Sequence, residues 1–73
     1  MKLNTKQIYF DACNRYGSMQ AFADSIGITS TRLYQILERE RVLSKKGAVL
    51  PSVVRVLTEL SQEGESIWNW ILD

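Results

Sequence analysis

The chain has no histidine and only one cysteine, Cys13, and these two shortages narrow its chemistry the most. Without histidine, neither a Ser-His-Asp site nor a Cys-His site can form. A single cysteine excludes an internal disulfide, and no residues show the spacing of metal ligands. We therefore expect a protein that is not an enzyme and needs no metal or cofactor. Cys13 is expected to be a small buried apolar residue in a reducing cytoplasm.

Long hydrophobic runs are also missing. No apolar stretch approaches the ~20 residues that a membrane-spanning helix needs. The first nine residues, MKLNTKQIY, lack the apolar core and the cleavage site of a signal peptide. The length of 73 residues predicts a single domain, residues 1–73. A domain this small buries only about 60% of the surface that its unfolded chain exposes, so a partner would help to stabilise it.

Neither sign of charge is in large excess over the whole chain, but the basic and acidic residues are unevenly distributed along it. The net charge is +1, yet residues 29–55 hold six basic residues against two acidic ones. Residues 56–73 hold four acidic residues and no basic one. Such a chain can present one face to phosphate and keep the other away from it. The alternative is a mixed, solvated surface without function.

Apolar spacing and capping residues predict an all-α, compact five-helix domain. The expected helices cover about residues 5–16, 19–26, 30–40, 51–62 and 65–72. Asn4 or Thr5 can cap the first helix, Ser18 can cap the second, and Pro51 suits the first turn of the fourth. Gly64 is expected to end the fourth helix. Residues 41–50 are expected to form a loop with buried apolar anchors, with a very short hairpin as the alternative.

The stretch from residue 19 to residue 36 organises the rest of the chain. Phe22, Ala23 and Ile26 recur on one face of the second expected helix. Gly27 can adopt the left-handed conformation that commonly ends a helix, and Thr29 can cap the next helix. The third helix then buries one face, formed by Leu33, Ile36 and Leu37.

This pattern resembles the helix-turn-helix of Cro and lambda-repressor-like phage regulators. In that family an alanine lies four residues before the turn glycine, as Ala23 does before Gly27, and apolar residues follow at the positions of Leu33 and Ile36. The resemblance covers roughly residues 8–41. A glutamine often opens the motif in that family, whereas this chain has Met19. The resemblance implies a small phage or prophage repressor in the cytoplasm of a bacterium or of a phage-infected host.

A recognition helix reads base edges in the major groove from its N-terminal half. The expected base-contacting residues are Ser30, Thr31, Arg32, Tyr34 and Gln35. Gln35 can bond bidentately to adenine, whereas Arg32 can bond to guanine or clamp a phosphate. The alternative for Tyr34 is packing on the first helix, with its hydroxyl at the backbone.

Further polar residues around the motif are expected to contact the DNA backbone. They are Ser18, Gln20, Thr29, Arg39, Lys45 and Lys46. The alternative for Thr29 is that it only caps the third helix. The alternative for the two lysines is that they are merely solvated turn residues.

The C-terminal part, residues 51–73, carries more apolar side chains than a small core can hold. It is expected to support dimerisation through Val54, Ile67, Trp68, Trp70 and Ile71. A homodimer would bind an inverted repeat in double-stranded DNA with recognition helices ~34 Å apart. No membrane and no small-molecule ligand are expected. The alternative for this segment is that it folds back as the domain's own lid.

Two other functions remain open at this point. The same helical core could be a protein–protein interaction module that presents Trp68 and Trp70 to polymerase or to a host factor. A DNA architectural role would instead give tight binding with little preference among sequences.

Overall fold

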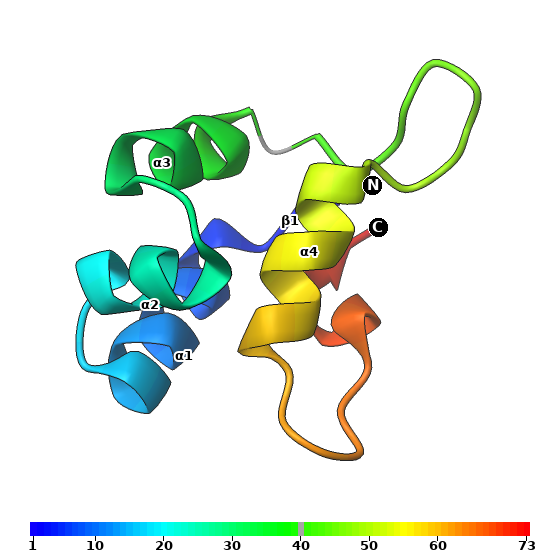
Figure 1. Cartoon of the computed structure of the whole chain (residues 1–73). Helices are drawn as coiled ribbons and strands as arrows, with labels where there is room; N and C mark the ends of the chain where they lie inside the picture. Colours follow the sequence, from blue (N-terminus) through cyan, green and yellow to red (C-terminus); the bar gives the residue numbers. More distant parts are fainter. Residues whose placement is uncertain (40) are drawn as a thin grey trace.

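Four α-helices form most of the fold in the computed structural model, which describes residues 1–39 and 41–73. They are α1 (Thr5–Tyr16), α2 (Met19–Ile26), α3 (Ser30–Glu38) and α4 (Pro51–Leu60) (Figure 1). The remaining elements are the strand β1 (Lys2–Leu3), the 3-10 helix η1 (Ile67–Trp70) and the strand β2 (Ile71–Leu72).

Local capping explains where the first three helices begin. The side chain of Asn4 accepts a hydrogen bond from the backbone N–H of Gln7 at 3.4 Å. The Ser18 and Thr29 hydroxyls accept from backbone N–H groups three residues later, each at 3.1 Å. These side chains satisfy N–H groups that have no partner within the helix. The predicted caps of α1, α2 and α3 are thereby confirmed.

The ends of two helices differ from their predicted positions. The third helix ends at Glu38, and its predicted last residue, Glu40, lies outside the described residues. The fourth ends at Leu60, earlier than predicted, because Ser61 leaves the helical conformation with a ψ of 136°. The Ser61 hydroxyl donates to the carbonyl of Leu57 at 2.7 Å, so a side chain rather than Gly64 terminates α4.

The apolar faces of all four helices meet in one core. Helix α2 contacts α1, α3 and α4, and α4 contacts η1. Three buried residues from outside the α-helices complete the core. They are Leu3, Val42 and Trp70. The core therefore depends on segments from both ends of the chain.

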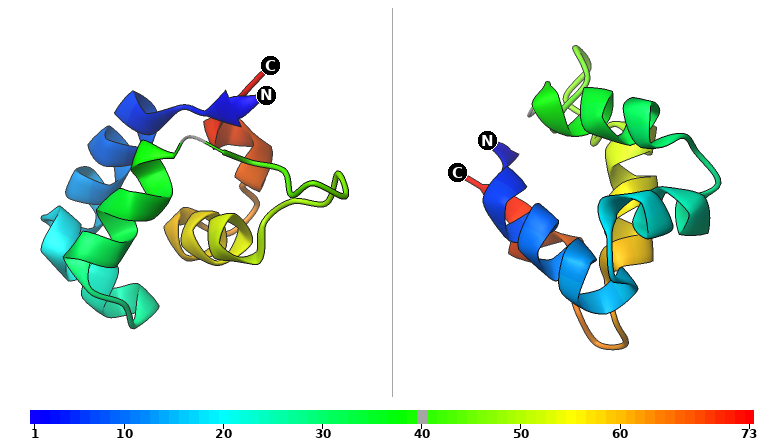
Figure 2. Two further views of the ribbon diagram at one scale, coloured as in Figure 1. Left: turned by 90° about the horizontal axis from the view of Figure 1, so that it is seen from above. Right: turned by 90° about the vertical axis from the view of Figure 1, so that its left-hand side faces the viewer.

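The prediction of a fifth helix over residues 65–72 is wrong. This segment forms η1 and then β2, which pairs antiparallel with β1 through Lys2–Leu72 and Leu3–Ile71. The backbone N–H of Asn4 also donates to the Trp70 carbonyl at 2.8 Å. Residues 71–72 therefore form backbone hydrogen bonds with residues 2–3 as a strand, instead of bonds within a helix. Both termini consequently lie side by side (Figures 1 and 2).

Residues 41–50 form a short hairpin rather than the unpaired loop that we expected. Leu43 and Val49 make an antiparallel bridge, and the N–H of Leu50 donates to the carbonyl of Val42 at 2.8 Å. Val42 is buried, so the expected apolar anchor is present. The tip of the hairpin extends away from the helices (Figures 1 and 2).

Cys13 is exposed, so its predicted burial is wrong. Helix α1 buries Ile8 and Ala12, and Cys13 lies about 100° farther around the helix than Ala12. Phe10, which also lies off the buried face, is 63% exposed.

Within the described residues, none of the helices has the length and apolar character needed to cross a membrane.

Candidate nucleic-acid interface

The turn between α2 and α3 is fixed by bonds to both α2 and α4. Gly27 has a φ of 89° and a ψ of 27°, which is the left-handed conformation. The N–H of Ile28 donates to the carbonyl of Ala23 and the N–H of Gly27 donates to the carbonyl of Asp24, each at 3.1 Å, as in a Schellman helix end. From α4, Nη2 of Arg55 donates to the carbonyl of Ile26 at 2.8 Å. The orientation of α3 is therefore set by its neighbours as well as by its own packing.

Helix α3 separates a buried face from an exposed polar face. Leu33 and Leu37 are fully buried and Ile36 is 8% exposed. The opposite side is exposed and consists of Thr31, Arg32, Tyr34, Gln35, Glu38 and Arg39. Ser30 is half-buried. The structure thus brings four of the five predicted base-contacting residues to the surface of one helix.

Polar side chains on this face are unpaired within the described part of the chain. In residues 1–39 and 41–73, the side chains of Thr31, Arg32 and Gln35, among others, make no hydrogen bond and no ion pair. Each carries donors or acceptors that are open to solvent or a ligand in this part of the chain. The outer face of α3 can therefore form directional hydrogen bonds with a bound partner.

Tyr34 is on the exposed face of α3 but also packs against α1. Its ring is 40% exposed and its centroid lies 6.1 Å from that of Tyr9, with the planes tilted by 41°. Burial raises the pKa of the Tyr9 hydroxyl, and the neighbouring Tyr34 and Glu38 raise it further. The predicted alternative, packing of Tyr34 on the first helix, is confirmed for the ring. Its hydroxyl makes no backbone hydrogen bond within the described residues.

One of the residues predicted to contact the DNA backbone, Arg39, is exposed at the C-terminal end of α3, and the other five form two separate groups. The first lies where α2 and α3 begin, and contains Ser18, Gln20 and Thr29; the second is the hairpin with Lys45 and Lys46, beyond the other end of α3 (Figures 1 and 2). At 1.5 Å per residue, α3 itself is about 13 Å long, and the hairpin lies beyond its C-terminal end. A partner that contacts both groups must extend along α3.

The polar side chains of the first group already make contacts inside the protein. Ser18 and Thr29 accept helix-capping bonds, as the alternative for Thr29 anticipated. The amide nitrogen of Gln20 donates to Asp24 at 3.1 Å. Each hydroxyl keeps its own proton for a further bond. Met19 is buried, so this position offers no polar contact.

Part of the acidic segment lies away from α3 and the hairpin. Figure 1 shows α3 and the hairpin at the top and residues 61–66 at the bottom. Glu63 and Glu65 belong to this lower segment, and Glu59, in the last turn of α4, accepts a bond from the Ser25 hydroxyl. These three carboxylates are therefore separated in space from the hairpin lysines.

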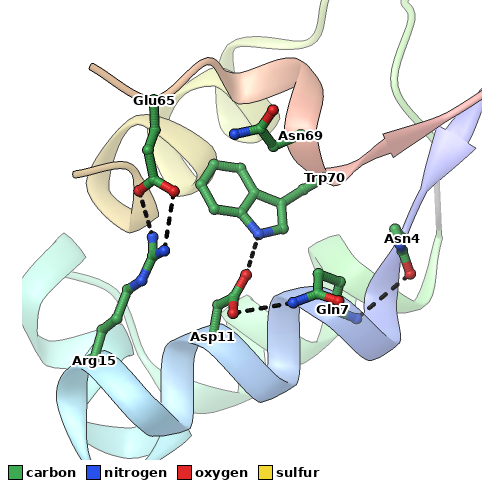
Figure 3. Close-up of a pocket in the computed structure, with 7 residues that line it drawn as sticks. All are labelled: Asn4, Gln7, Asp11, Arg15, Glu65, Asn69 and Trp70. Carbon is green, nitrogen blue, oxygen red and sulfur yellow. Dashed lines mark hydrogen bonds and ion pairs between the residues drawn. The ribbon is translucent and has the colours of Figure 1, made fainter. Parts of the chain in front are cut away.

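The C-terminal segment closes over α1 through polar contacts that the sequence did not indicate. Asp11 accepts from the Trp70 indole at 2.7 Å and from the Gln7 amide at 3.1 Å (Figure 3). Arg15 donates to both carboxylate oxygens of Glu65, at 2.8 and 3.0 Å, and lies 5.6 Å from the centre of the Trp70 ring. These residues line a polar cleft of about 450 Å³.

The same contacts shift the pKa values of Asp11, Arg15 and Glu65. Partial burial raises the pKa of Asp11, but the bonds from Trp70 and Gln7 and the charge of Arg15 outweigh it, and the net shift is downward. The hydrogen bonds between Arg15 and Glu65 lower the pKa of the Glu65 carboxyl and raise the pKa of the Arg15 guanidinium. The charged side chains that line the cleft are therefore bonded to one another or to neighbouring residues of the same protein.

Trp70 is 1% exposed, so its predicted place on an exposed dimerisation surface is wrong. The alternative, that the C-terminal segment folds back over the domain as a lid, is correct for Trp70. Its ring is buried in the core and its indole N–H donates to Asp11. Ile67 and Ile71 are partly buried against the core. Among the other predicted dimerisation residues, Trp68 is 52% exposed and Val54 is 38% exposed.

No protein-family model, curated protein or solved structure matches the chain. Any function must therefore be argued from the residues themselves. The described residues also contain no group of three or more His, Cys, Asp or Glu side chains that could hold a metal ion.

Proposed function

We propose that this protein is a sequence-specific regulator of transcription that binds double-stranded DNA. In this proposal α2 and α3 form a helix-turn-helix of the Cro and lambda-repressor type, and α3 enters the major groove. The observation that carries the proposal is the outer face of α3, where Thr31, Arg32 and Gln35 are exposed and their side chains form no hydrogen bond or ion pair within the described chain. The rigid turn at Gly27 supports it, because base reading requires a fixed helix.

The side chains on this face suit the edges of bases. The Gln35 amide can donate to and accept from adenine, and the Thr31 methyl can touch the methyl of thymine. A good bidentate pair discriminates against the wrong base by about 1–3 kcal/mol. Glu38 on the same face would be repelled by phosphate but can accept from cytosine.

The charge distribution supports the same orientation. Lys45 and Lys46 lie beyond one end of α3, and the start of α2 lies near the other. Lysine side chains neutralise phosphates, and the N–H groups that begin a helix bind them. Arg39 is exposed on the flank of α3. Residues 61–66, with Glu63 and Glu65, lie at the opposite end from α3 and the hairpin (Figure 1).

We propose that the protein binds as a homodimer at an inverted repeat and represses by excluding polymerase from the DNA that it covers. The exposed apolar side chains of Trp68 and Val54 support a contact between copies. Sedimentation of the wild type and of Trp68→Ala tests this contact. A wild-type dimer that the substitution weakens agrees with it, whereas a wild-type monomer without DNA contradicts it.

Selection of bound duplexes from a random pool tests the DNA proposal. We expect one enriched motif that consists of two inverted half-sites with centres about 10 base pairs apart, one turn of DNA. Binding without an enriched motif would favour an architectural role. Failure to retain any duplex would contradict DNA binding.

A second candidate is a protein-binding module, which the exposure of Trp68 and Phe10 favours. Tryptophan is enriched at the centres of protein interfaces. In this case Gln35→Ala would leave partner binding unchanged and Trp68→Ala would weaken it.

A further inference from the structure

A small cavity lies between the α2–α3 turn and the first turns of α4. It has a volume of about 100 Å³. Its floor is aliphatic, and its polar lining consists of Arg32 from α3 together with Ser52 and Arg55 from α4. Two arginines and one serine thus line a single hollow beside α3.

The two guanidinium groups are not neutralised within the described chain. In residues 1–39 and 41–73, no carboxylate lies within 4.0 Å of Arg32 or Arg55. Arg55 uses one donor on the carbonyl of Ile26, at 2.8 Å. A guanidinium has five N–H donors, so most of the donors of both arginines remain available.

The start of α4 adds positive potential to the same hollow. The Leu50 N-cap position makes no side-chain capping bond, and Pro51 occupies the first turn. The N–H groups of a first turn carry the positive end of the helix dipole. Ser52 is in this turn and lines the cavity, so its hydroxyl can join the arginines.

The size of the cavity limits what it can hold. A volume of about 100 Å³ equals that of roughly three water molecules in the liquid. The unesterified oxygens and the phosphorus of a phosphodiester are small enough for this space. The aliphatic floor keeps the local dielectric constant low, which strengthens attraction between an anion and the arginines.

We infer that Arg32, Arg55 and Ser52 form a phosphate-binding site that takes one backbone phosphate of the bound DNA. The inference rests on the proposed function, and it assigns Arg32 to phosphate rather than to guanine. Arg32 precedes Gln35 by three residues, so the two side chains are neighbours on the surface of α3. A phosphate held in the cavity would lie beside the face that reads the bases.

The first experiment measures the affinity for a selected duplex over a range of salt concentrations for Arg32→Gln, Arg55→Gln and Ser52→Ala. The control is Lys6→Gln, which removes an exposed positive charge from α1. We expect each arginine variant to bind about ten-fold more weakly and the salt slope to fall by about 0.9. Ser52→Ala is expected to bind more weakly than the control without a change of slope.

Thermal unfolding of each variant distinguishes binding from positioning, because Arg55 also holds the turn. If only Arg55→Gln lost affinity while Arg32→Gln and Ser52→Ala matched the control, Arg55 would be a positioning residue and the inference would be overturned. Arg55→Lys keeps the charge without the fork, and is expected to retain the salt slope while losing part of the affinity.

The second experiment identifies the source of the phosphate. Duplexes with one neutral methylphosphonate at a time are bound to the wild type and to the Arg32→Gln/Arg55→Gln double variant. The wild type should lose affinity at one position per half-site to which the double variant is insensitive. Inorganic phosphate is titrated separately into the free protein, with the amide signals of Ile28, Ser52 and Val53 as the readout.

The outcomes separate this inference from the DNA proposal. Tight duplex binding with unchanged affinity and slope in both arginine variants would overturn the phosphate site alone. Phosphate-dependent shifts that Arg55→Gln abolishes, without duplex binding, would support an anion site but contradict DNA as its ligand. The absence of both responses would overturn both proposals.

Discussion

The outer face of α3 and the face of α1 that meets η1 carry the same kinds of side chain in opposite states. On α1, Arg15 and Gln7 are bonded to Glu65 and Asp11 inside the protein (Figure 3). On α3, Arg32 and Gln35 are exposed, and their side chains bond to no other described residue. Polar residues on a helix therefore do not by themselves indicate a binding face.

The difference follows from what each helix packs against. The C-terminal segment returns over α1 and brings Glu65 and Trp70 to it, whereas α3 has no such cover on its outer side (Figure 2). We interpret the α1 face as stabilising and the α3 face as binding.

Replacing Trp70 with alanine should have the largest effect on stability. The ring is 1% exposed and its N–H bonds to Asp11, so Trp70→Ala should lower the free energy of unfolding by about 3–5 kcal/mol. Trp68→Ala, at a 52% exposed position, should change it by about 0.5 kcal/mol or less. Chemical denaturation measures both, and equal losses would contradict the lid role of Trp70.

Two glycines allow the turn to be tested against a matched control. Gly27 has a φ of 89° and Gly17 has a φ of 92°, so alanine at either should cost about 1–2 kcal/mol. Only Gly27→Ala should also weaken DNA binding, because Gly27 is in the turn that orients α3; the added Cβ itself would make only an ordinary contact, 3.5 Å from Nη2 of Arg55. Equal loss of DNA affinity in both variants would mean that general destabilisation explains the effect.

Acid should weaken the α1 face selectively. Both carboxyl groups have pKa values below their ordinary values, 3.8 for Asp11 and 4.5 for Glu65. Their contributions are complete above those ordinary values and are lost as the pH falls through the lower folded values. Unfolding measured from pH 6 to pH 3 should therefore show a decline that begins near 4.5. Glu65→Gln should be less stable than the wild type at pH 6 and decline less; an identical pH profile would contradict the ion pair's role.

The smallest effect is expected from a lysine of the hairpin. Lys46→Ala should weaken binding to all duplexes to a similar extent and reduce the salt slope by about 1, because a phosphate contact carries no base information. Its unfolding free energy should be unchanged, since the side chain is exposed. A change of base preference in this variant would contradict a backbone contact.

Much of the helical structure was predictable because its determinants are local. Ser18, Gly27 and Thr29 act on groups within four residues of themselves, and their predicted roles are present in the structure. The outer face of α3 was predictable for the same reason, since a helix wheel alone separates Gln35 from Leu33.

The rest depends on contacts between residues far apart in the chain. The Arg15–Glu65 pair joins residues 50 positions apart, and the Asp11–Trp70 bond joins residues 59 positions apart. No local pattern marks such partners, so Trp70 was predicted to be on the surface. The pairing of β1 with β2 was missed for the same reason, and with it the true form of the C-terminal segment.

Two glutamines, one on each face, test the central claim most directly. The random-duplex selection is performed in parallel with the wild type, Gln35→Ala and Gln7→Ala. We predict that the wild type and Gln7→Ala enrich the same motif, and that Gln35→Ala loses its preference at one base pair in each half-site. An identical motif from all three proteins would contradict the claim that the outer face of α3 reads DNA.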